Sequence, residues 1–317
     1  MTDYDMPTEE TIGIVGLGNM GMPMVRRLVG SGRRVVAMAR SEARSSEARS
    51  CGAETVGSIA ELALRTCTVL LSVPADADVE IVCLGPSGLA SLLAPGSLVV
   101  DTSTISPAAA RRVATAFEER NIAFVDAPVS GGTVGVEQGT LAVMAGGTSQ
   151  ALDLAELVVA PFAGKFVRCG PSGSGQVAKA CNQLVVATTL QLVSEALVLA
   201  RAAGADVHAV REALLGGFAA SRVLELQGLR MIDRDFAPRG TVAMQRKDVR
   251  VIQELARLSG VKSLPAFEAA AASVGRLDDA GGGSLDHSAL VMVCEHDSDI
   301  SLGNIPVALD FTSQQKR

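Results

Sequence analysis

One short segment near the amino end of the chain most constrains the fold. Residues 11–15 are an apolar run, residues 16–21 form a G-x-G-x-x-G sequence, and an amphipathic stretch follows directly. This order is typical of a strand–turn–helix unit, because Gly16 permits a tight turn, Gly18 lets a diphosphate approach the main chain, and Gly21 lets the helix pack on the strand. The amino end of that helix attracts anions. The sequence therefore predicts a dinucleotide-binding loop whose cofactor contacts are Gly16, Leu17, Gly18, Asn19, Met20 and Gly21.

The residue after the second predicted strand, 34–38, bears on the choice of cofactor. NAD enzymes place an acidic residue there to bind the ribose 2′-hydroxyl, whereas this chain has Arg40. An arginine can bind a 2′-phosphate, and Arg44, one helical turn on, could add a second charge. NADP is therefore favoured, and NAD stays possible. The alternative interpretation is that Arg40 is a solvated surface residue.

The size and charge of the chain limit the classes of protein that it can belong to. At 317 residues, two domains are the default expectation. A net charge of −6 leaves no basic face for nucleic acid, so we expect a small anionic ligand instead. The six cysteines show no C-x-x-C pair, and most have apolar neighbours. We interpret them as reduced core thiols of a cytoplasmic protein.

Neither the first ten residues nor the most apolar stretch of the chain predicts a targeting or membrane segment. Residues 1–10 are acidic and polar, without an apolar targeting core, and we expect a loose tail there. The most apolar stretch, 184–200, is shorter than the ~20 residues of a membrane span and contains Gln191, Ser194 and Glu195. We expect a buried helix and no membrane partner.

Further apolar runs alternate with helical patterns up to about residue 167. These runs lie at 68–73, 97–101, 122–126, 141–145 and 166–167, and their alternation with helices predicts a doubly wound sheet with right-handed crossovers. Ligands bind beyond the carboxyl ends of such strands. Val73 and Pro74 follow one strand, 102–104 follow the next, and 128–132 follow a third. We expect these segments to line one cleft, with Val73 and Pro74 as cofactor contacts.

The alternation of strand and helix patterns ends at Gly170. There a Pro-Ser-Gly-Ser-Gly segment, which disfavours regular structure, precedes a long helical pattern from residue 176 to about 203. That helix is apolar on nearly every side, which predicts burial between domains or subunits. Later helical patterns cover about 207–215, 220–233, 242–259 and 265–276. The domains expected are a Rossmann domain at 11–169 and an all-helical domain at 170–295, with tails at 1–10 and 296–317.

Two strand ends carry groups suited to binding. Thr104 lies in Asp-Thr-Ser-Thr-Ile-Ser-Pro, residues 101–107, and we expect it to contact the nicotinamide half of the cofactor; the alternative is helix capping. Ser130 is followed by Gly131 and Gly132, a sequence that exposes successive N–H groups to a substrate carboxylate. Its alternative is a plain loop with a capping serine.

Lys179, near the start of the long helix, is the sharpest catalytic candidate, and Asn182 lies three residues on, on the same helix face. Burial, the helix dipole and a cationic nicotinamide all disfavour a charged lysine, which suits proton transfer. Asn182 or Gln183 could hold the lysine or the substrate oxygen by hydrogen bonds. The alternative is an ordinary surface lysine.

Lys247 could reach the cofactor or the substrate acid, or could belong to a solvated helix face.

Other chemistries lack their sequence signatures. His208, His287 and His296 do not have metal-ligand spacing, so no metal site is expected. The chain also lacks the G-x-S-x-G of hydrolases and the G-K-[ST] of a P-loop.

Together, these motifs resemble the β-hydroxyacid dehydrogenase family, which includes 3-hydroxyisobutyrate dehydrogenase and tartronate semialdehyde (2-hydroxy-3-oxopropionate) reductase. The resemblance spans about 11–295 and rests on segments 16–21, 101–107, 126–144, 173–182 and 247–248. It implies that Lys179 is the catalytic acid/base, that Ser130 and Gly131 bind the substrate carboxylate, and that Asn182 assists. It also implies that Thr104 and Lys247 contact the cofactor. Arg222 matches no fixed family residue and could touch a substrate acid or lie on the surface.

The resemblance implies an amino-terminal Rossmann domain, a long interdomain helix and an all-helical domain that forms homodimers or homotetramers. The function expected is an NADP-preferring interconversion of a small 3-hydroxy acid and its semialdehyde, with Lys179 as general acid/base. The two alternatives are an imine reductase of the same superfamily and a non-catalytic NADP-binding sensor or interaction protein. The pattern of residues does not indicate which acid is used or which direction is physiological.

Overall fold

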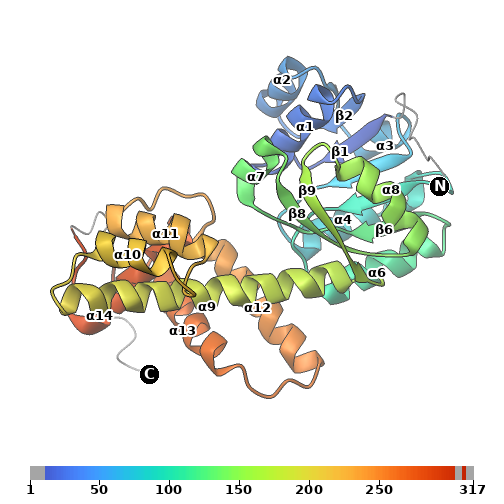
Figure 1. The fold of residues 1–317 in the computed structure, drawn as a ribbon. Helices are drawn as coiled ribbons and strands as arrows, with labels where there is room; N and C mark the ends of the chain where they lie inside the picture. Colours follow the sequence, from blue (N-terminus) through green and yellow to red (C-terminus); the bar gives the residue numbers. More distant parts are fainter. Residues whose placement is uncertain (1–10, 304–308, 312–317) are drawn as a thin grey trace. The chain divides into compact units, whose positions relative to one another are not determined.

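The computed structural model describes residues 11–303 and 309–311. The chain divides into an amino-terminal unit, Met1–Lys179, and a helical unit, Ala180–Arg317. The predicted fold class is confirmed: a Rossmann-like sheet domain is followed by the long helix α9 and a helical carboxyl-terminal domain (Figure 1).

The amino-terminal unit is built on a sheet whose first six strands run in the order β3-β2-β1-β4-β5-β6, all parallel. This is the doubly wound order: the chain adds strands outward from β1 in one direction up to β3 and then, from β4 on, in the other direction. Ligands bind beyond the carboxyl ends of the strands at the point where the strand order reverses, between β1 and β4. The strands are β1 Ile12–Val15, β2 Val35–Met38, β3 Glu54–Val56, β4 Thr68–Leu71, β5 Leu98–Asp101, β6 Ala123–Asp126, β7 Val129–Ser130, β8 Leu141–Gly146 and β9 Ala163–Gly170.

Both faces of this sheet are covered, which explains why its central strands are apolar without alternation. In β4, Leu70 belongs to one core while Val69 and Leu71 belong to the other. Helices α1 and α8 contribute to the first core, and α4 and α6 to the second. The helices of this unit are α1 Gly21–Gly30, α2 Glu42–Ser50, α3 Ile59–Ala63, α4 Asp76–Leu84, α5 Leu89–Leu92, α6 Pro107–Glu118, α7 Gly132–Gln138 and α8 Ser149–Val159.

Beyond β6 the sheet departs from the expected pattern of parallel strands. β8 is antiparallel to both β6 and β7, and β9 then pairs parallel to β8. The sequence also did not predict β3 or the two-residue β7, and it predicted only 166–167 of β9. These three strands are short or largely exposed, so they lack the continuous apolar run that marks a buried strand.

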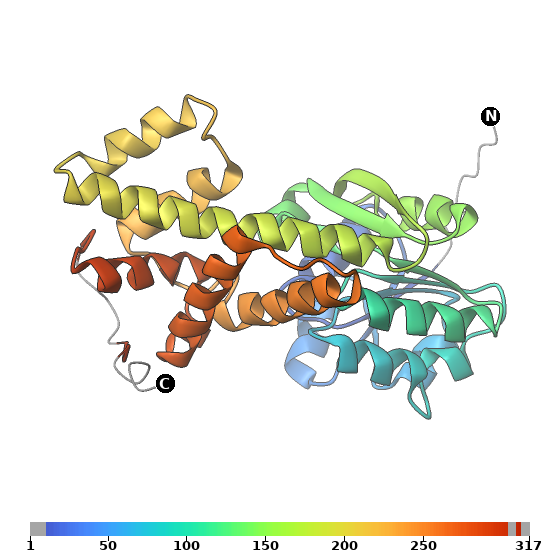
Figure 2. The ribbon, with the colours of Figure 1, turned by 90° about the horizontal axis from the view of Figure 1, so that it is seen from below.

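Helices α10 to α14 complete the helical unit, in which α12 packs on α13 and α10 on α11 (Figure 2). Serine, threonine and aspartate side chains cap three of these helices: Asp206 caps α10, Ser221 caps α11 and Thr241 caps α12. The bounds are α9 Ser174–Ala202, α10 Val207–Leu215, α11 Arg222–Asp233, α12 Val242–Leu258, α13 Pro265–Asp279 and α14 Val291–Ser298, with 3₁₀ turns at Gly282–Ser284 and His287–Leu290.

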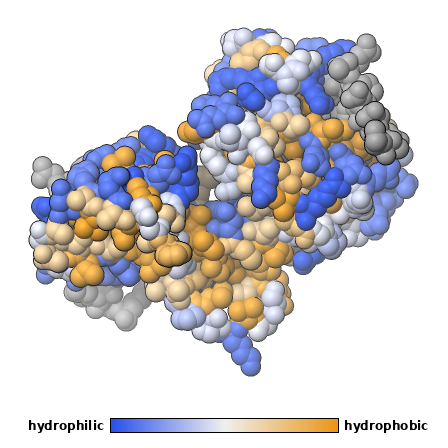
Figure 3. Space-filling model, viewed as in Figure 1, coloured by the Kyte–Doolittle hydropathy of each residue, from blue (hydrophilic) through white to orange (hydrophobic). Residues whose placement is uncertain are grey.

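Helix α9 is less buried than its composition suggests. Val185, Leu192 and Leu199 are 59%, 57% and 70% exposed, and their spacing of seven residues places them on one face. Figure 3 shows apolar surface over the part of the helical unit that carries α9. By length and composition alone this helix could cross a membrane, but the core helix of a soluble protein meets the same criteria.

Part of the segment predicted as a carboxyl-terminal tail packs on the helical unit. Leu302 is buried, and Phe311 lies against the same core and stacks on His296. The Leu302 N–H donates to Glu295, which also forms a paired ion contact with Arg234 at 2.9 Å. No periodic pattern of apolar residues marks this segment, because its contacts are made by isolated side chains in an irregular stretch. The predicted amino-terminal tail, 1–10, lies outside the described residues, as do 304–308 and 312–317.

Candidate active site

The glycine-rich loop after β1 has the close main-chain contacts that the sequence predicts. Gly16 has φ +99°, and a Cβ there would lie 2.1 Å from the main-chain oxygen of Ser72. A Cβ on Gly21 would lie 1.8 Å from the main-chain oxygen of Gly16. Neither distance is possible for a real side chain, so the turn and the helix start both require glycine.

Gly18 differs from these two glycines because a Cβ on it would meet nothing within 4 Å. Gly18 and Asn19 are exposed beside the amino end of α1, where free N–H groups favour an anion. Leu17 is buried and Met20 packs on the core, so their main chains rather than their side chains face this space. The loop therefore fits the diphosphate of a dinucleotide.

The end of β2 presents arginine side chains to solvent. Arg40 is exposed directly after this strand, and in the described part of the chain it forms no ion pair. Arg44 pairs with Glu47 at 2.7 Å. Both residues lie in α2, which Ser41 caps at its amino end. Arg40 is therefore available to an incoming phosphate, and its surface position leaves the alternative interpretation open as well.

The loops after β4 and β5 are tied together by hydrogen bonds. The Val73 N–H donates to the Ser103 hydroxyl at 2.9 Å, and the Ser106 N–H donates to Asp76 at 3.0 Å. Ser106, not Thr104, caps helix α6, so the helix-capping interpretation of Thr104 does not hold. Val73 and half-buried Thr104 thus lie on linked loops at the carboxyl edge of the sheet, next to exposed Pro74.

Two buried carboxyl groups lie at this edge, on paired residues of β5 and β6. Burial raises the pKa of Asp101 to about 7, while hydrogen bonds from Ser103 oppose the shift. Burial also raises the pKa of Asp126 to about 6, against N–H donors from residues 173–176. The sequence reasoning assigned neither carboxyl a function, although both stood at strand ends in the quoted motifs.

The serine–glycine segment lies where β7 passes into α7. Ser130 pairs with Ala142 of β8, Gly131 has φ +133° and Gly132 has φ +64°. Gly131 and Gly132 are exposed at the amino end of α7. Successive main-chain N–H groups in a turn can face an anion, which is the arrangement that a carboxylate-binding loop uses.

Lys179 lies in the second turn of α9, and only 8% of its surface is exposed. The alternative interpretation of Lys179 as an ordinary surface residue therefore fails. Gln176, one helical turn earlier, is also buried and bonds to the loop that carries Thr104. The structure thus places a buried amine on the same unit as the glycine loop, Thr104 and Ser130.

In the helical unit, hydrogen bonds connect Asn182 with the neighbourhood of Lys247. Asn182 donates to Gln183 at 2.8 Å, and Gln183 donates to Asp248 of α12 at 2.5 Å. Asp248 also pairs with Lys247 at 3.2 Å. Asp248 stands in the motif 247–248 but was assigned no role from the sequence, because its bond to Gln183, 65 residues away, arises only through packing. Arg222 forms an exposed pair with Glu225, as its surface interpretation expects.

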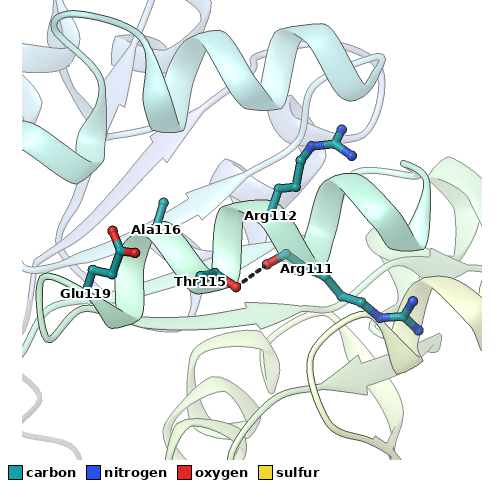
Figure 4. A pocket seen from close by; sticks show the side chains of 5 residues that line it. All are labelled: Arg111, Arg112, Thr115, Ala116 and Glu119. Atoms are coloured by element: carbon teal, nitrogen blue, oxygen red, sulfur yellow. Dashed lines mark hydrogen bonds between the residues drawn. The ribbon is translucent and has the colours of Figure 1, made fainter.

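Other features of the structure bear less on the site. A pocket of about 360 Å³ lies on α6 and is lined from this single helix by Arg111, Arg112, Thr115, Ala116 and Glu119 (Figure 4). It includes none of the predicted site residues. Among the described residues, no group of three or more histidine, cysteine or acidic side chains could hold a metal ion. Cys83 and Cys294 are buried, but Cys67 and Cys181 are exposed, so the expectation of core thiols is wrong for that pair.

The sheet order and the glycine loop define a dinucleotide-binding protein. Residues 11–207 match the family described as the NAD binding domain of 6-phosphogluconate dehydrogenase. Residues 173–294 match the family described as NAD-binding of NADP-dependent 3-hydroxyisobutyrate dehydrogenase. The chain belongs to the 3-hydroxyisobutyrate dehydrogenase, or β-hydroxyacid dehydrogenase, family.

Individual relatives agree with this assignment. The 2-hydroxy-3-oxopropionate reductase of Escherichia coli is 35% identical over 90% of this chain and 97% of its own length. A probable 3-hydroxyisobutyrate dehydrogenase-like protein of Arabidopsis thaliana, named as mitochondrial, is 32% identical over 95% of this chain and 90% of its own. The solved 3-hydroxyisobutyrate dehydrogenase of Mycobacterium tuberculosis with L-serine has a TM-score of 0.82 and 30% identity, covering 90% of this chain and 99% of that one.

The protein is thus an NAD(P)-dependent 3-hydroxyacid dehydrogenase that acts on CH–OH groups. This assignment differs from both alternatives considered above, an imine reductase and a non-catalytic sensor.

Proposed function

We propose that this enzyme interconverts a small 3-hydroxy acid and its semialdehyde, of the 3-hydroxyisobutyrate or tartronate semialdehyde type, with NADP preferred over NAD. The observation that carries the proposal is the buried Lys179 amine near the start of α9, on the same unit as the glycine loop. The reductase from Escherichia coli, similar over nearly its whole length, supports the substrate class.

Each group of this chain has a role in the proposed reaction. When bound, NADPH supplies the hydride and NADP⁺ accepts it. Lys179 donates a proton to the substrate oxygen during reduction and takes it back during oxidation. The N–H groups at Gly131 and Gly132, together with Ser130, bind and orient the carboxylate. Asn182 assists by hydrogen bonding, and Thr104 and Lys247 contact the cofactor.

The preference for NADP rests on Arg40. Its guanidinium is exposed beyond β2 and has no carboxylate competing for it among the described residues. A free arginine can bind a phosphate through two hydrogen bonds, whereas it has no acceptor for a ribose hydroxyl.

Assembly and location complete the proposal. The exposed row of Val185, Leu192 and Leu199 on α9 supports a homodimer or homotetramer, because large apolar side chains exposed along one helix face are typical of association sites. We place the enzyme in the cytoplasm, where an exposed thiol such as Cys181 stays reduced. Fractionation of cells would detect a mitochondrial location instead.

Replacement of the lysine tests the reaction. In Lys179→Ala we expect kcat to fall by about 10²- to 10⁴-fold, the range of a lost general acid, while the Kd for NADPH changes only a few-fold. The assay follows NADPH or NADH consumption with 2-hydroxy-3-oxopropionate and related semialdehydes, and NADPH should give the higher kcat/KM.

The exposed Lys165 of β9 provides the matched control, and Lys165→Ala should retain wild-type turnover. If Lys179→Ala also retained it, the assignment of the acid/base would be wrong.

A further inference from the structure

Gln176 makes long-range contacts that the proposed reaction does not use. Its side chain is 1% exposed and lies in the first turn of α9. Its Oε1 accepts the Ile105 N–H at 3.1 Å, and its Nε2 donates to the Ser103 main-chain oxygen at 2.8 Å. The two bonded residues flank Thr104, so one amide holds both sides of the predicted cofactor contact.

A second group, the carboxylate of Asp126, holds the main chain around Gln176. Asp126 at the end of β6 accepts the Gly173 N–H at 2.7 Å with Oδ1 and the Gln176 N–H at 2.9 Å with Oδ2. A Cβ on Gly175 would lie 2.3 Å from the Met144 oxygen and 2.5 Å from the Asp126 oxygen. The start of α9 is therefore packed directly on the ends of β6 and β8 and has little freedom to shift.

We propose that Gln176 is a positioning residue that fixes the loop carrying Thr104 relative to the helix turn carrying Lys179. Lys179 follows Gln176 by three residues, so whatever holds Gln176 in place also holds the start of the turn that presents the amine. The inference rests on the proposed role of Lys179. In this inference Gln176 keeps the loop of Thr104 at a constant position relative to the amine of Lys179.

The chemistry of the amide explains why glutamine suits this position. The loop offers one donor, the Ile105 N–H, and one acceptor, the Ser103 oxygen. A primary amide satisfies both at once, whereas an apolar side chain satisfies neither and a carboxylate accepts only. A protonated carboxylic acid can again do both.

Two variants use this difference. Gln176→Met keeps the length of the side chain and removes both bonds, and we expect kcat with NADPH and 2-hydroxy-3-oxopropionate to fall about 10- to 100-fold, as small misplacement of reacting groups does. In Gln176→Glu, burial raises the pKa of the new carboxyl. Its kcat relative to wild type should therefore recover as the pH is lowered and the acid becomes protonated, and decline as the pH rises.

Ser97→Ala is the matched control. It also removes a buried hydrogen bond from side chain to main chain, to Ala94 at 2.7 Å, but at the amino end of β5. We expect it to lower the melting temperature to a degree comparable with Gln176→Met and to leave kcat unchanged. Circular dichroism and thermal melts check that all variants are folded, and Gln176→Glu at low pH keeps the test open if Gln176→Met does not fold.

A double-mutant cycle with Lys179→Ala measures whether Gln176 acts through the lysine, using single turnovers at high enzyme concentration. If it does, Gln176→Met should change the residual rate of Lys179→Ala less than about two-fold. If the losses of rate caused by the two substitutions multiply instead, Gln176 does not act through the lysine and the inference is overturned. Wild-type turnover in Gln176→Met, a kcat of Gln176→Glu that does not depend on pH relative to wild type, or an equal loss of kcat in Ser97→Ala would overturn it as well.

The outcomes separate this inference from the proposed function. Full turnover in Lys179→Ala refutes the acid/base assignment, and the inference falls with it. A collapse of turnover in Lys179→Ala together with normal turnover in Gln176→Met refutes the role of Gln176 alone.

Discussion

At the scale of single residues, the three glycines of the loop after β1 carry different constraints. Gly16 and Gly21 are required by the protein itself, since a side chain on either would overlap a main-chain oxygen. Gly18 has open space around its Cα, so only a ligand can explain a need for glycine there. We therefore expect Gly16 and Gly21 to be structural positions and Gly18 to be a binding position.

Alanine substitutions should separate these roles. We expect Gly16→Ala and Gly21→Ala to lower the free energy of unfolding by about 2 kcal/mol or more, because their side chains overlap rigid main chain. Gly18→Ala should change stability by less than about 0.5 kcal/mol but weaken NADPH binding at least ten-fold, because a methyl group there would keep a diphosphate from approaching the main chain. Urea unfolding and fluorescence titration with NADPH measure the two effects.

Loss of NADPH affinity in a fully stable Gly16→Ala, or unchanged affinity in Gly18→Ala, would contradict this division. Gly30 at the other end of α1, where a Cβ would also meet nothing within 4 Å, is the control: Gly30→Ala should leave the affinity unchanged.

At the scale of secondary-structure elements, sequence reasoning worked where the signal was local. The bounds predicted for 207–215 coincide with α10, and those for α11 and α12 differ by one or two residues, because capping residues and helical periodicity mark these ends. The same reasoning missed β3, β7 and most of β9. Their pairing is decided by a neighbouring strand, which a single segment does not encode.

The candidate site shows the same division between local and long-range information. The glycine loop, Ser130 and Lys179 stand in recognisable local patterns, and the burial of Lys179 rules out only its interpretation as a surface residue. Gln176 and Asp126 gain significance only from hydrogen bonds between residues 50 to 73 positions apart. No window of sequence contains both partners, so their connection became visible only in the fold.

The segment after α14 offers a test at the same scale. Leu302 is 8% exposed and contacts the core of the helical unit, so Leu302→Ala should lower the free energy of unfolding by about 2–3 kcal/mol. Leu258→Ala, at a leucine 59% exposed on α12, should cost less than about 1 kcal/mol. Chemical unfolding of both variants gives the comparison, and equal small effects would show that the segment is a loose tail after all.

At the scale of the whole molecule, association of subunits follows from the exposed face of α9. Leu192 lies in the middle of a row of three exposed apolar side chains. A carboxylate at this position would be buried without a partner in an assembled interface.

We therefore expect Leu192→Asp to raise the dissociation constant of the homo-oligomer by at least about 100-fold and to give monomers at micromolar concentration. Light scattering coupled to size-exclusion chromatography measures the mass. Leu64→Asp, at a leucine 86% exposed in the amino-terminal unit, is the control and should keep the wild-type mass. An unchanged mass for Leu192→Asp would place the interface elsewhere.

The course of α9 also determines how such a chain can be recombined with its relatives. The two compact units meet at Lys179 and Ala180, inside a helix that runs unbroken from Ser174 to Ala202. A hybrid gene joined at that boundary would encode an α9 whose two parts come from different proteins. Lys179 and Asn182 would then also come from different proteins. A junction at Gly173, where the backbone already turns with φ +90°, would transfer the helix whole, so natural and engineered exchange of substrate specificity should favour crossovers there.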